Sequence, residues 1–384
     1  MAGSPSIHVF WHEGMLNHDT GYGVFDTGED PGFLDVLDKH PENSDRIKNM
    51  VSILKRGPLS PFITWHSGRH ALLSELHSFH HQDYVNELVE ADKNGGKVMC
   101  CGTFLNPGSW DVSLLAAGTT LSAMKHVLEG QGNIAYALVR PPGHHAQPTR
   151  ADGYCFLNNA GLAVHLALNS GCEKVAVVDI DVHHGNGTAE GFYMSNKVLT
   201  ISLHMDHGSW GPSHPQSGSI DELGEGQGYG YNLNIPLPNG TGNRGYEYAM
   251  KTLVVPAIQK FEPHMIVLVV GQDSSATREN ILSKCLTAIL LMVMLYDVKL
   301  FVNLVYIYLI VMSLHFFTFK LVRSKWKAML DDGWLLEIGQ IISELAKKYS
   351  SGSLLIVQEG GYHVTYSAYC LHATLEGYST YRLL

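Results

Sequence analysis

Three residues that can bind a metal follow one apolar run of this sequence at alternate positions. In the stretch VAVVDIDVHHGNGT, which begins at residue 175, Asp179, Asp181 and His183 come after four small apolar residues. In an extended strand such residues lie on one side, because successive side chains alternate between the two faces. Two neighbouring carboxylates are unfavourable unless a cation or hydrogen bonds offset their charge. The spacing indicates a metal site or, as the alternative, an aspartate that caps the next turn beside a histidine in a polar cleft.

Four other apolar runs also lead into residues that can do chemistry. They are NIAYALV (followed by His144 and His145), VLTISLH (His204), MIVLVV (Gln272 and Asp273) and SLLIVQ (Glu359 and Tyr362). Short runs of this kind predict strands buried on both faces and so a mostly parallel sheet. Stretches of helical character at 158–171 and 245–261 alternate with them. The pattern predicts an open, doubly wound α/β sheet with helices on both faces, in which ligands bind beyond the carboxyl ends of the strands.

Asp181, His183 and Asp273 form the set that we expect to bind a metal. Asp273 follows a different strand from the other two, and a GNG turn follows His184. Two carboxylates and one imidazole leave positions for water and substrate, as in catalytic metal sites. These ligands suit zinc, and iron(II) is the alternative, because the sequence does not fix the identity of the metal.

His144 and His145 are candidates for acid–base catalysis, since a further pair of ligands would overcrowd the ion. Imidazole titrates near neutral pH, which suits proton transfer from water. Asp179, which is outside the metal set, would orient one imidazole, and Asn186 would hold the other without adding charge. The alternative is a loop pair bonded to the backbone, in a chain with 22 histidines.

Tyr362 follows Gly360 and Gly361, which allow the backbone to approach a ligand closely. A phenol at this position could donate a hydrogen bond to an oxygen that becomes negative in a transition state. A surface tyrosine in a glycine turn is the alternative, and the residue taken alone favours it.

Composition limits the possible classes of protein. The chain has 384 residues, of which 45% are hydrophobic and 16% charged, as in a large globular enzyme. A formal net charge of −10 gives no basic footprint, so we expect no direct binding to nucleic acid. The six cysteines lack metal-finger spacing and are expected to be reduced thiols. The start, MAGSPSIHVFWHEG, lacks the pattern of a signal peptide, so a soluble intracellular protein is expected.

Six motifs, in this order, resemble those of the zinc-dependent histone deacetylases: RPPGHHA, GYCFLNNA, VDIDVHHGNGT, ISLH, GQDSSA and QEGGYH. The resemblance runs from about residue 7 to 276 and resumes from about 339 to 376. Asn186 in HHGNG and the motif EGGYH are similar to the class II branch. WHEGMLNHDTGYGVFDTG and HPENSDRIKNM are similar to plant enzymes of that branch. The implied fold is a single α/β domain of the arginase/deacetylase type over residues 1–384.

The resemblance implies a role for each matching residue. The metal set would hold one Zn²⁺ per chain, His145 would be the general base with His144 as its partner, and Tyr362 would polarise the scissile carbonyl. Asp179 and Asn186 would support the two histidines. Gly153, Tyr154 and Trp210 would line a narrow substrate tunnel. Carbonyl groups would hold a structural K⁺ near Asp179, Asp181, His183, Ser202 and Leu203.

The implied activity is hydrolysis of the acetamide of N-ε-acetyl-lysine in histones or other proteins, with release of acetate. The resemblance further implies a chromatin and transcription regulator of the nucleus and cytoplasm. Small acetylated amines are alternative substrates for the same chemistry. A catalytically impaired member with a binding or vestigial role is a second alternative. A binuclear ureohydrolase-type enzyme is disfavoured, because no D-x-H-x-D segment supplies a second metal position.

The segment at about 277–334 departs from the family pattern. Residues 300–319 contain no Asp, Glu, Lys or Arg, and a run of about 20 apolar residues can span a bilayer. The other readings are an aberrantly translated segment, which we favour, and a buried or partner-binding helix. A single span would separate Asp273 from Tyr362, two parts of one site, so we expect no true membrane span.

Overall fold

The computed structural model describes residues 7–22, 37–100, 102–206, 217–238, 240–275 and 332–378. Its centre is an eight-stranded sheet in which every neighbouring pair of strands is parallel. The strand order across the sheet is β2 (Ile63–Ser67), β1 (Ile7–Trp11), β5 (Ile134–Ala137), β10 (Leu354–Gln358), β9 (Met265–Val270), β6 (Val175–Asp179), β7 (Val198–Asp206) and β8 (Asn232–Pro238). The expected parallel α/β sheet is therefore confirmed. A separate antiparallel pair consists of β3 (Lys97–Cys100) and β4 (Thr103–Leu105).

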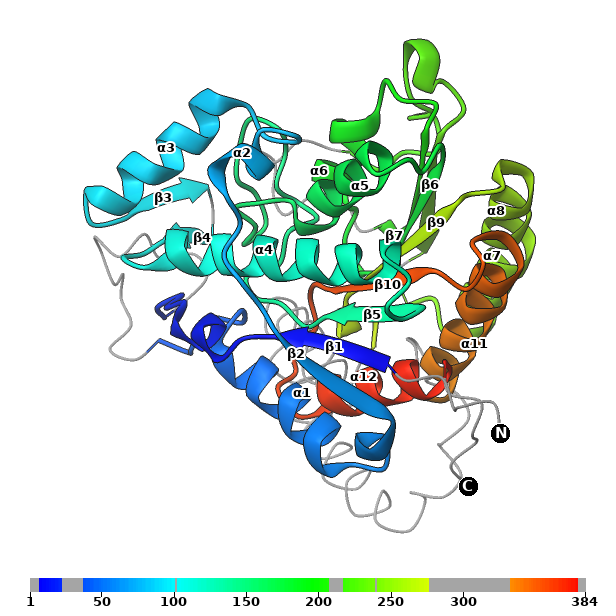
Figure 1. The fold of residues 1–384 in the computed structure, drawn as a ribbon, viewed down its shortest axis with the longest axis horizontal. Coiled ribbons are helices and arrows are strands. Elements are labelled where there is room, and N and C mark those ends of the chain that lie inside the picture. Colours follow the sequence, from blue (N-terminus) through cyan, green and yellow to red (C-terminus); the bar gives the residue numbers. More distant parts are fainter. Residues whose placement is uncertain are drawn as a thin grey trace, which may run out of the picture.

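Helices cover both faces of this sheet, as Figure 1 shows. One face carries α2 (Leu73–Leu76), α3 (Gln82–Lys93), α4 (Ser109–Leu128), α5 (Asn159–Asn169) and α6 (Asn186–Phe192). The other carries α1 (Ser44–Arg56), α7 (Asn243–Ala249), α8 (Val255–Phe261), α11 (Asp332–Tyr349) and α12 (Tyr366–Glu376). Short 3₁₀ turns lie at Glu13–Asn17, Ser60–Phe62, Gly226–Gly228 and Gln272–Ser274.

The central strands are apolar throughout because both of their sides are buried. In β9, Ile266 and Leu268 belong to the hydrophobic cluster on one face, while Val267 and Val269 belong to the cluster on the other. All five strands expected from the sequence form. Two have different ends, since β5 stops at Ala137 and β7 continues past His204 to Asp206.

The helical stretch expected at 245–261 forms two helices joined by a π-helical turn, Met250–Val254. Pro256 lies just after this turn. Its ring has no N–H and would collide with the carbonyl group four residues earlier in a regular α-helix. A wider turn relieves that collision, as π-bulges do.

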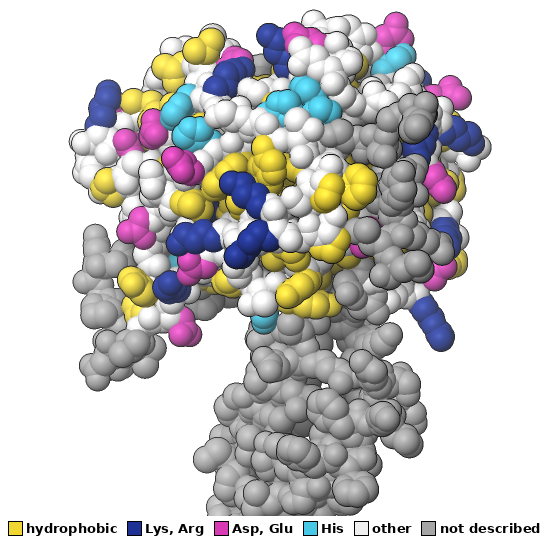
Figure 2. All heavy atoms as spheres, turned by 60° about the horizontal axis from the view of Figure 1, so that its bottom comes forward, with side chains coloured by type: hydrophobic (Ala, Val, Ile, Leu, Met, Phe, Trp, Pro, Cys, Tyr) yellow, Lys and Arg dark blue, Asp and Glu magenta, His cyan; other side chains and the backbone are white. Residues whose placement is uncertain are grey.

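Some features expected from the sequence lie outside the described residues. These are Trp210, the apolar run 300–319 and most of the segment 277–334. Among the residues that are described, no helix is both long and apolar enough to cross a membrane. No disulfide joins the described cysteines. On the face in Figure 2, charged side chains of both signs lie among hydrophobic ones. The expectation that the chain does not bind nucleic acid directly stays a prediction.

Candidate active site

Four adjacent strands bring the predicted site residues to one edge of the sheet. β5, β10, β9 and β6 are neighbours in this order and run parallel, so their carboxyl ends lie at the same edge. The residues that follow these strands are His144 and His145 after β5, Tyr362 after β10, Asp273 after β9, and Asp181 and His183 after β6. Strands that are far apart in the sequence therefore contribute to one cluster.

The predicted metal set converges. Donor atoms of Asp181, His183 and Asp273 all lie within 4.8 Å of one another. Nδ1 of His183 lies 2.9 Å from Oδ1 of Asp181 and 3.2 Å from Oδ2 of Asp273. Oδ2 of Asp273 is buried and, among the described residues, receives no aligned hydrogen bond. A buried carboxylate oxygen that faces the His183 imidazole fits a cation, because a buried negative charge is costly unless it is paired.

Two glycines make room for the carboxylates. A Cβ atom at Gly271 would collide with Asp181, and one at Gly360 would collide with both Asp181 and Asp273. The N–H of Gly360 donates to Oδ2 of Asp181 at 3.0 Å, and the N–H of Val182 donates to Oδ1 of Asp273 at 3.1 Å. The backbone thus fixes both carboxylates beside His183.

The electrostatics of the set favour a positive charge. Burial alone lowers the pKa of His183, but the neighbouring carboxylates of Asp181 and Asp273 raise it to about 9. For the acid Asp181, burial has the opposite effect and would raise the pKa. The neighbouring His144 and His183 instead hold the pKa of Asp181 well below its usual value. The two carboxylates therefore stabilise a cation here, and a proton on His183 or a bound metal ion can supply it. The donor types and their convergence fit zinc.

His144 and His145 lie side by side, with ring centroids 4.0 Å apart, but they have opposite surroundings. Nδ1 of His144 lies 2.8 Å from Oδ2 of Asp179. Burial alone would lower the pKa of His144. The negative charges of Asp179, Asp181 and Glu359 outweigh this effect and raise the pKa well above its usual value. Burial and the neighbouring His144 and His183 instead place the pKa of His145 well below its usual value.

Asn186 holds His145 in a defined tautomer. Oδ1 of Asn186 lies 2.7 Å from Nδ1 of His145, and Nδ2 of Asn186 donates to Oδ2 of Asp152 at 3.0 Å. The carboxylate only accepts, so the amide nitrogen faces Asp152 and the amide oxygen faces the imidazole. Nδ1 of His145 therefore carries the hydrogen, and Nε2 is the basic atom. The sequence reasoning missed Asp152, because no spacing signal connects it to Asn186.

Tyr362 and Tyr154 form one wall of the site. Their rings meet edge to face, with centroids 5.8 Å apart and an angle of 88°. Burial raises the pKa of Tyr362 well above its usual value, so its hydroxyl keeps its proton. Gly153 has a φ of +50°, and a Cβ there would press on the ring of His145. The third predicted tunnel residue, Trp210, is outside the described residues.

The comparisons with known proteins agree with this geometry. The histone deacetylase domain family matches residues 40–300 of the chain. This chain belongs to the histone deacetylase family. It is 60% identical over 373 residues to histone deacetylase 8 of Arabidopsis thaliana, covering 97% of this chain and 87% of that protein. The predicted resemblance to plant histone deacetylases is therefore confirmed.

More distant histone deacetylase relatives cover a similar range. The histone deacetylase-like amidohydrolase of Pseudomonas aeruginosa is 31% identical over 344 residues, covering 89% of this chain and 78% of the relative. The crystal structure of the HDA15 HD domain superposes with a TM-score of 0.75 at 26% identity. That superposition covers 97% of this chain and 87% of the other. The shared fold is thus supported by both sequence and structure.

In this histone deacetylase fold, a buried ion-pair network supports the loop that carries Tyr362. Nε of Arg46 donates to the carbonyl of Gly361 at 2.7 Å, and Nη2 donates to that of Glu359 at 2.6 Å. The guanidinium also lies 4.7 Å from the centre of the Tyr362 ring. Glu42 accepts from Arg46 at 2.9 Å and from Arg140 at 2.8 Å. Sequence reasoning found none of this network.

Glu359 connects the Tyr362 loop to the histidine loop. Its Oε2 accepts from the N–H groups of Gly143 at 2.6 Å and His144 at 3.1 Å. Burial raises the pKa of Glu359 to about 7. The sequence placed Glu359 at a strand end but assigned it no role, and the structure shows that it positions the loop before His144.

Proposed function

We propose that this member of the histone deacetylase family hydrolyses the acetamide of N-ε-acetyl-lysine in proteins and releases acetate. The observation that carries the proposal is the convergence of Asp181, His183 and Asp273 beside two histidines of opposite proton affinity. The names of the relatives, histone deacetylase and histone deacetylase-like amidohydrolase, support the same chemistry.

One Zn²⁺ is the cofactor that these residues would hold. When bound, zinc lowers the pKa of a water molecule and polarises the substrate carbonyl. The two carboxylates and the Nδ1 atom of His183 supply a donor set with positions left for water and substrate. A K⁺ ion bound by carbonyl groups of β6 and β7, where Asp179 pairs with Ser202, is a further part of the proposal.

The protein groups divide the proton transfers between them. His145 is neutral, and its Nε2 accepts a proton from the attacking water as general base. His144 keeps a proton beside Asp179 and can supply it to the departing amine. Tyr362 donates its hydroxyl hydrogen to the substrate oxygen as that oxygen gains negative charge.

Tyr154 and Gly153 support recognition of a long, neutral side chain. The Tyr154 ring stands against Tyr362 at the site and offers an apolar face for the alkyl stem of acetyl-lysine. Trp210 would complete this wall. Acetylated histone tails in the nucleus and acetylated cytoplasmic proteins are the proposed substrates, which would make the enzyme a regulator of chromatin and transcription.

Acetate release from an acetyl-lysine peptide and from an acetylated diamine tests the proposal. We expect the purified chain to turn over the peptide faster, and Tyr362→Phe to slow it roughly 10²- to 10³-fold through loss of an oxyanion donor. Zinc content should be the same in both proteins. A zinc-loaded wild-type chain that releases acetate from neither substrate would contradict the proposal.

A further inference from the structure

A second group of metal-binding side chains lies away from the catalytic cluster. His8 of β1, His66 of β2 and His126 of α4 each offer a ring nitrogen, and these atoms lie within 4.8 Å of one another. Nδ1 of His8 lies 2.9 Å from Nε2 of His66. The ring centroid of His126 is 4.3 Å from that of His8 and 4.8 Å from that of His66. We call these three residues the histidine cluster.

The tautomer of His126 is fixed by neighbouring side chains. Nε2 of Gln131 donates to Oε2 of Glu129 at 3.1 Å, so the amide oxygen of Gln131 faces the other way. That oxygen lies 3.1 Å from Nδ1 of His126 and accepts its hydrogen. Nε2 of His126 is therefore left with a lone pair. An oriented imidazole whose second nitrogen donates to an oxygen is the usual arrangement of a metal-ligating histidine.

Within the described parts of the chain, this lone pair has no hydrogen-bond partner. His126 is only 7% exposed, and among the described residues no hydrogen bond reaches its Nε2. A Cβ built on Gly132 would lie 2.8 Å from Nε2 of His126 and 2.6 Å from Nε2 of His8. One nitrogen from each of two rings thus lies close to the same point, and a glycine leaves that point open.

The pKa values of His8 and His66 both lie below the usual value for histidine, which favours their neutral, metal-binding form. Burial, followed by the proximity of His126 and His66, lowers the pKa of His8 to about 4. Burial and His126 also lower the pKa of His66. Neutral imidazole is the form that binds metals, so little proton competition opposes a cation here.

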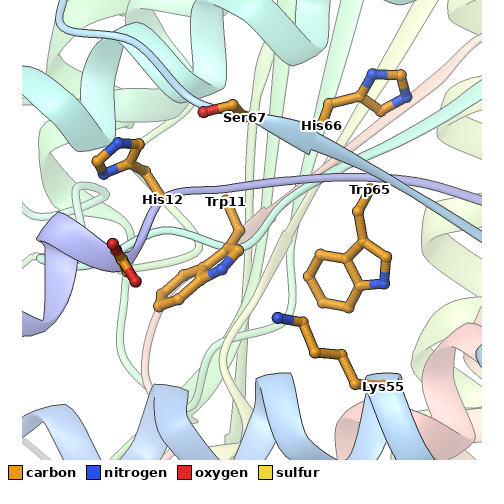
Figure 3. Close-up of a pocket in the computed structure, with 7 residues that line it drawn as sticks. Trp11, His12, Lys55, Trp65, His66 and Ser67 are labelled. Atoms are coloured by element: carbon orange, nitrogen blue, oxygen red, sulfur yellow. The ribbon is translucent and has the colours of Figure 1, made fainter.

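The cluster is separate from the catalytic residues. β2 and β1 are the first two strands of the sheet, beyond β5, and none of the proposed catalytic residues follows either of them. In Figure 3, His66 and Trp65 project from opposite faces of β2, and His66 also lines the pocket that contains Trp11, Trp65 and Lys55. An ion bound here would connect the edge strand β2 to β1 and α4.

We propose that His8, His66 and His126 bind one divalent transition-metal ion, with Zn²⁺ as the expected species. Three imidazole nitrogens suit Zn²⁺, Ni²⁺ and Cu²⁺ and disfavour Mg²⁺ and Ca²⁺. With this site filled, the chain carries a second metal ion in addition to the one at the catalytic set. The role of this ion is to hold β2 against the sheet.

Zinc titration of the full-length chain, with zinc chloride and a competing chelator, tests the proposal. Wild type should bind two equivalents, and His126→Gln should bind one. Gln131 is exposed, so its replacement leaves the core intact. Gln131→Leu removes the acceptor for His126 Nδ1 and should weaken the second equivalent roughly 10- to 100-fold. Gln131→Glu retains an acceptor and should bind like wild type.

The outcomes separate this site from the catalytic one. Asp181→Ala should release no acetate, but it should still bind the equivalent of zinc at the histidine cluster, which is the one that His126→Gln loses. Gln131→Leu should keep wild-type acetate release. A His126→Gln chain that binds as much zinc as wild type, or Leu and Glu variants at position 131 with the same zinc affinity, would overturn the proposal. Zinc at the histidine cluster is measured by binding and not by activity. A negative result for this site therefore leaves the proposed deacetylase function untouched.

Discussion

His144 faces a carboxylate and His145 faces an amide, and this difference separates the proton affinities of two adjacent imidazoles. The Asp179 contact at 2.8 Å stabilises a charged His144, and that charge in turn opposes protonation of His145. Asn186, oriented by Asp152, supports His145 without adding charge next to it. Pairs of groups whose pKa values are pushed apart commonly act as acid and base.

We expect His145→Ala to lower acetate release roughly 10²- to 10⁴-fold, the usual contribution of a positioned general base. Zinc content should stay at the wild-type level, because the metal set is unchanged. Turnover with an acetyl-lysine peptide and metal analysis of the same preparation check this. If zinc is lost together with activity, His145 is a ligand or a structural residue.

The motifs at the strand ends predicted the metal set and the two histidines with their supports, but not the partners that lie outside those motifs. Asp179, Asp181 and His183 could be predicted because they occupy alternate positions at the end of one apolar run, although β6 ends at Asp179 and the other two follow it. Asp152 and Asn186 are 34 positions apart, and Arg46 lies 315 positions from Gly361. No local pattern connects such partners, so only the fold reveals them.

At the scale of elements, one ion-pair network joins α1 to the loops after β5 and β10. Glu42, just before α1, is buried with Arg46 and Arg140. Burial opposes its charge, but Arg140 and Arg46 hold the pKa of Glu42 below its usual value of 4.5. The ionised Glu42 therefore stabilises the fold fully above pH 4.5, and this contribution is lost as the pH falls through the folded-state pKa of Glu42.

Glu42→Gln should reduce the free energy of unfolding by about 3–5 kcal/mol, because two buried guanidinium groups lose their counter-charge. The matched control is Glu87→Gln, whose partner Lys97 is exposed, and its effect should be at most about 1 kcal/mol. Urea unfolding at neutral pH measures both, and the difference should shrink on acidification. Equal effects of the two substitutions would show that the network does not support the fold.

Five strands, β5, β6, β7, β9 and β10, could be predicted from the sequence, whereas β1, β2, β8 and the order of the strands could not. Each central strand is apolar because helices cover both faces, and this burial is visible in composition. The last strand, β10, lies between β5 and β9. That position depends on how the crossover helices pack, which a run of apolar residues does not encode.

For the whole molecule, we expect the segment between β9 and α11 to limit the solubility and activity of the chain. The family match ends at residue 300, within this segment, and residues 300–319 are uncharged. Trp334, at the end of the predicted 277–334 segment, is 3% exposed in α11 and packs in the core. A replacement should therefore end at residue 331.

We expect the full chain to be poorly soluble and weakly active, because a long apolar run favours aggregation when it is exposed. Exchange of residues 277–331 for a short polar loop should raise both soluble yield and acetate release. The two proteins are to be expressed and assayed side by side. A full chain that is soluble, fully active and not improved by the exchange would make the segment an integral part of the fold.

The central claim is that three strand-end residues hold the zinc on which amide hydrolysis depends. Zinc content and acetate release of wild type and Asp181→Ala, measured on the same preparations, test it most directly. We predict that Asp181→Ala binds one equivalent of zinc less than wild type and releases no measurable acetate, while His145→Ala keeps the wild-type zinc content. An Asp181→Ala protein with wild-type zinc content and turnover would contradict the account.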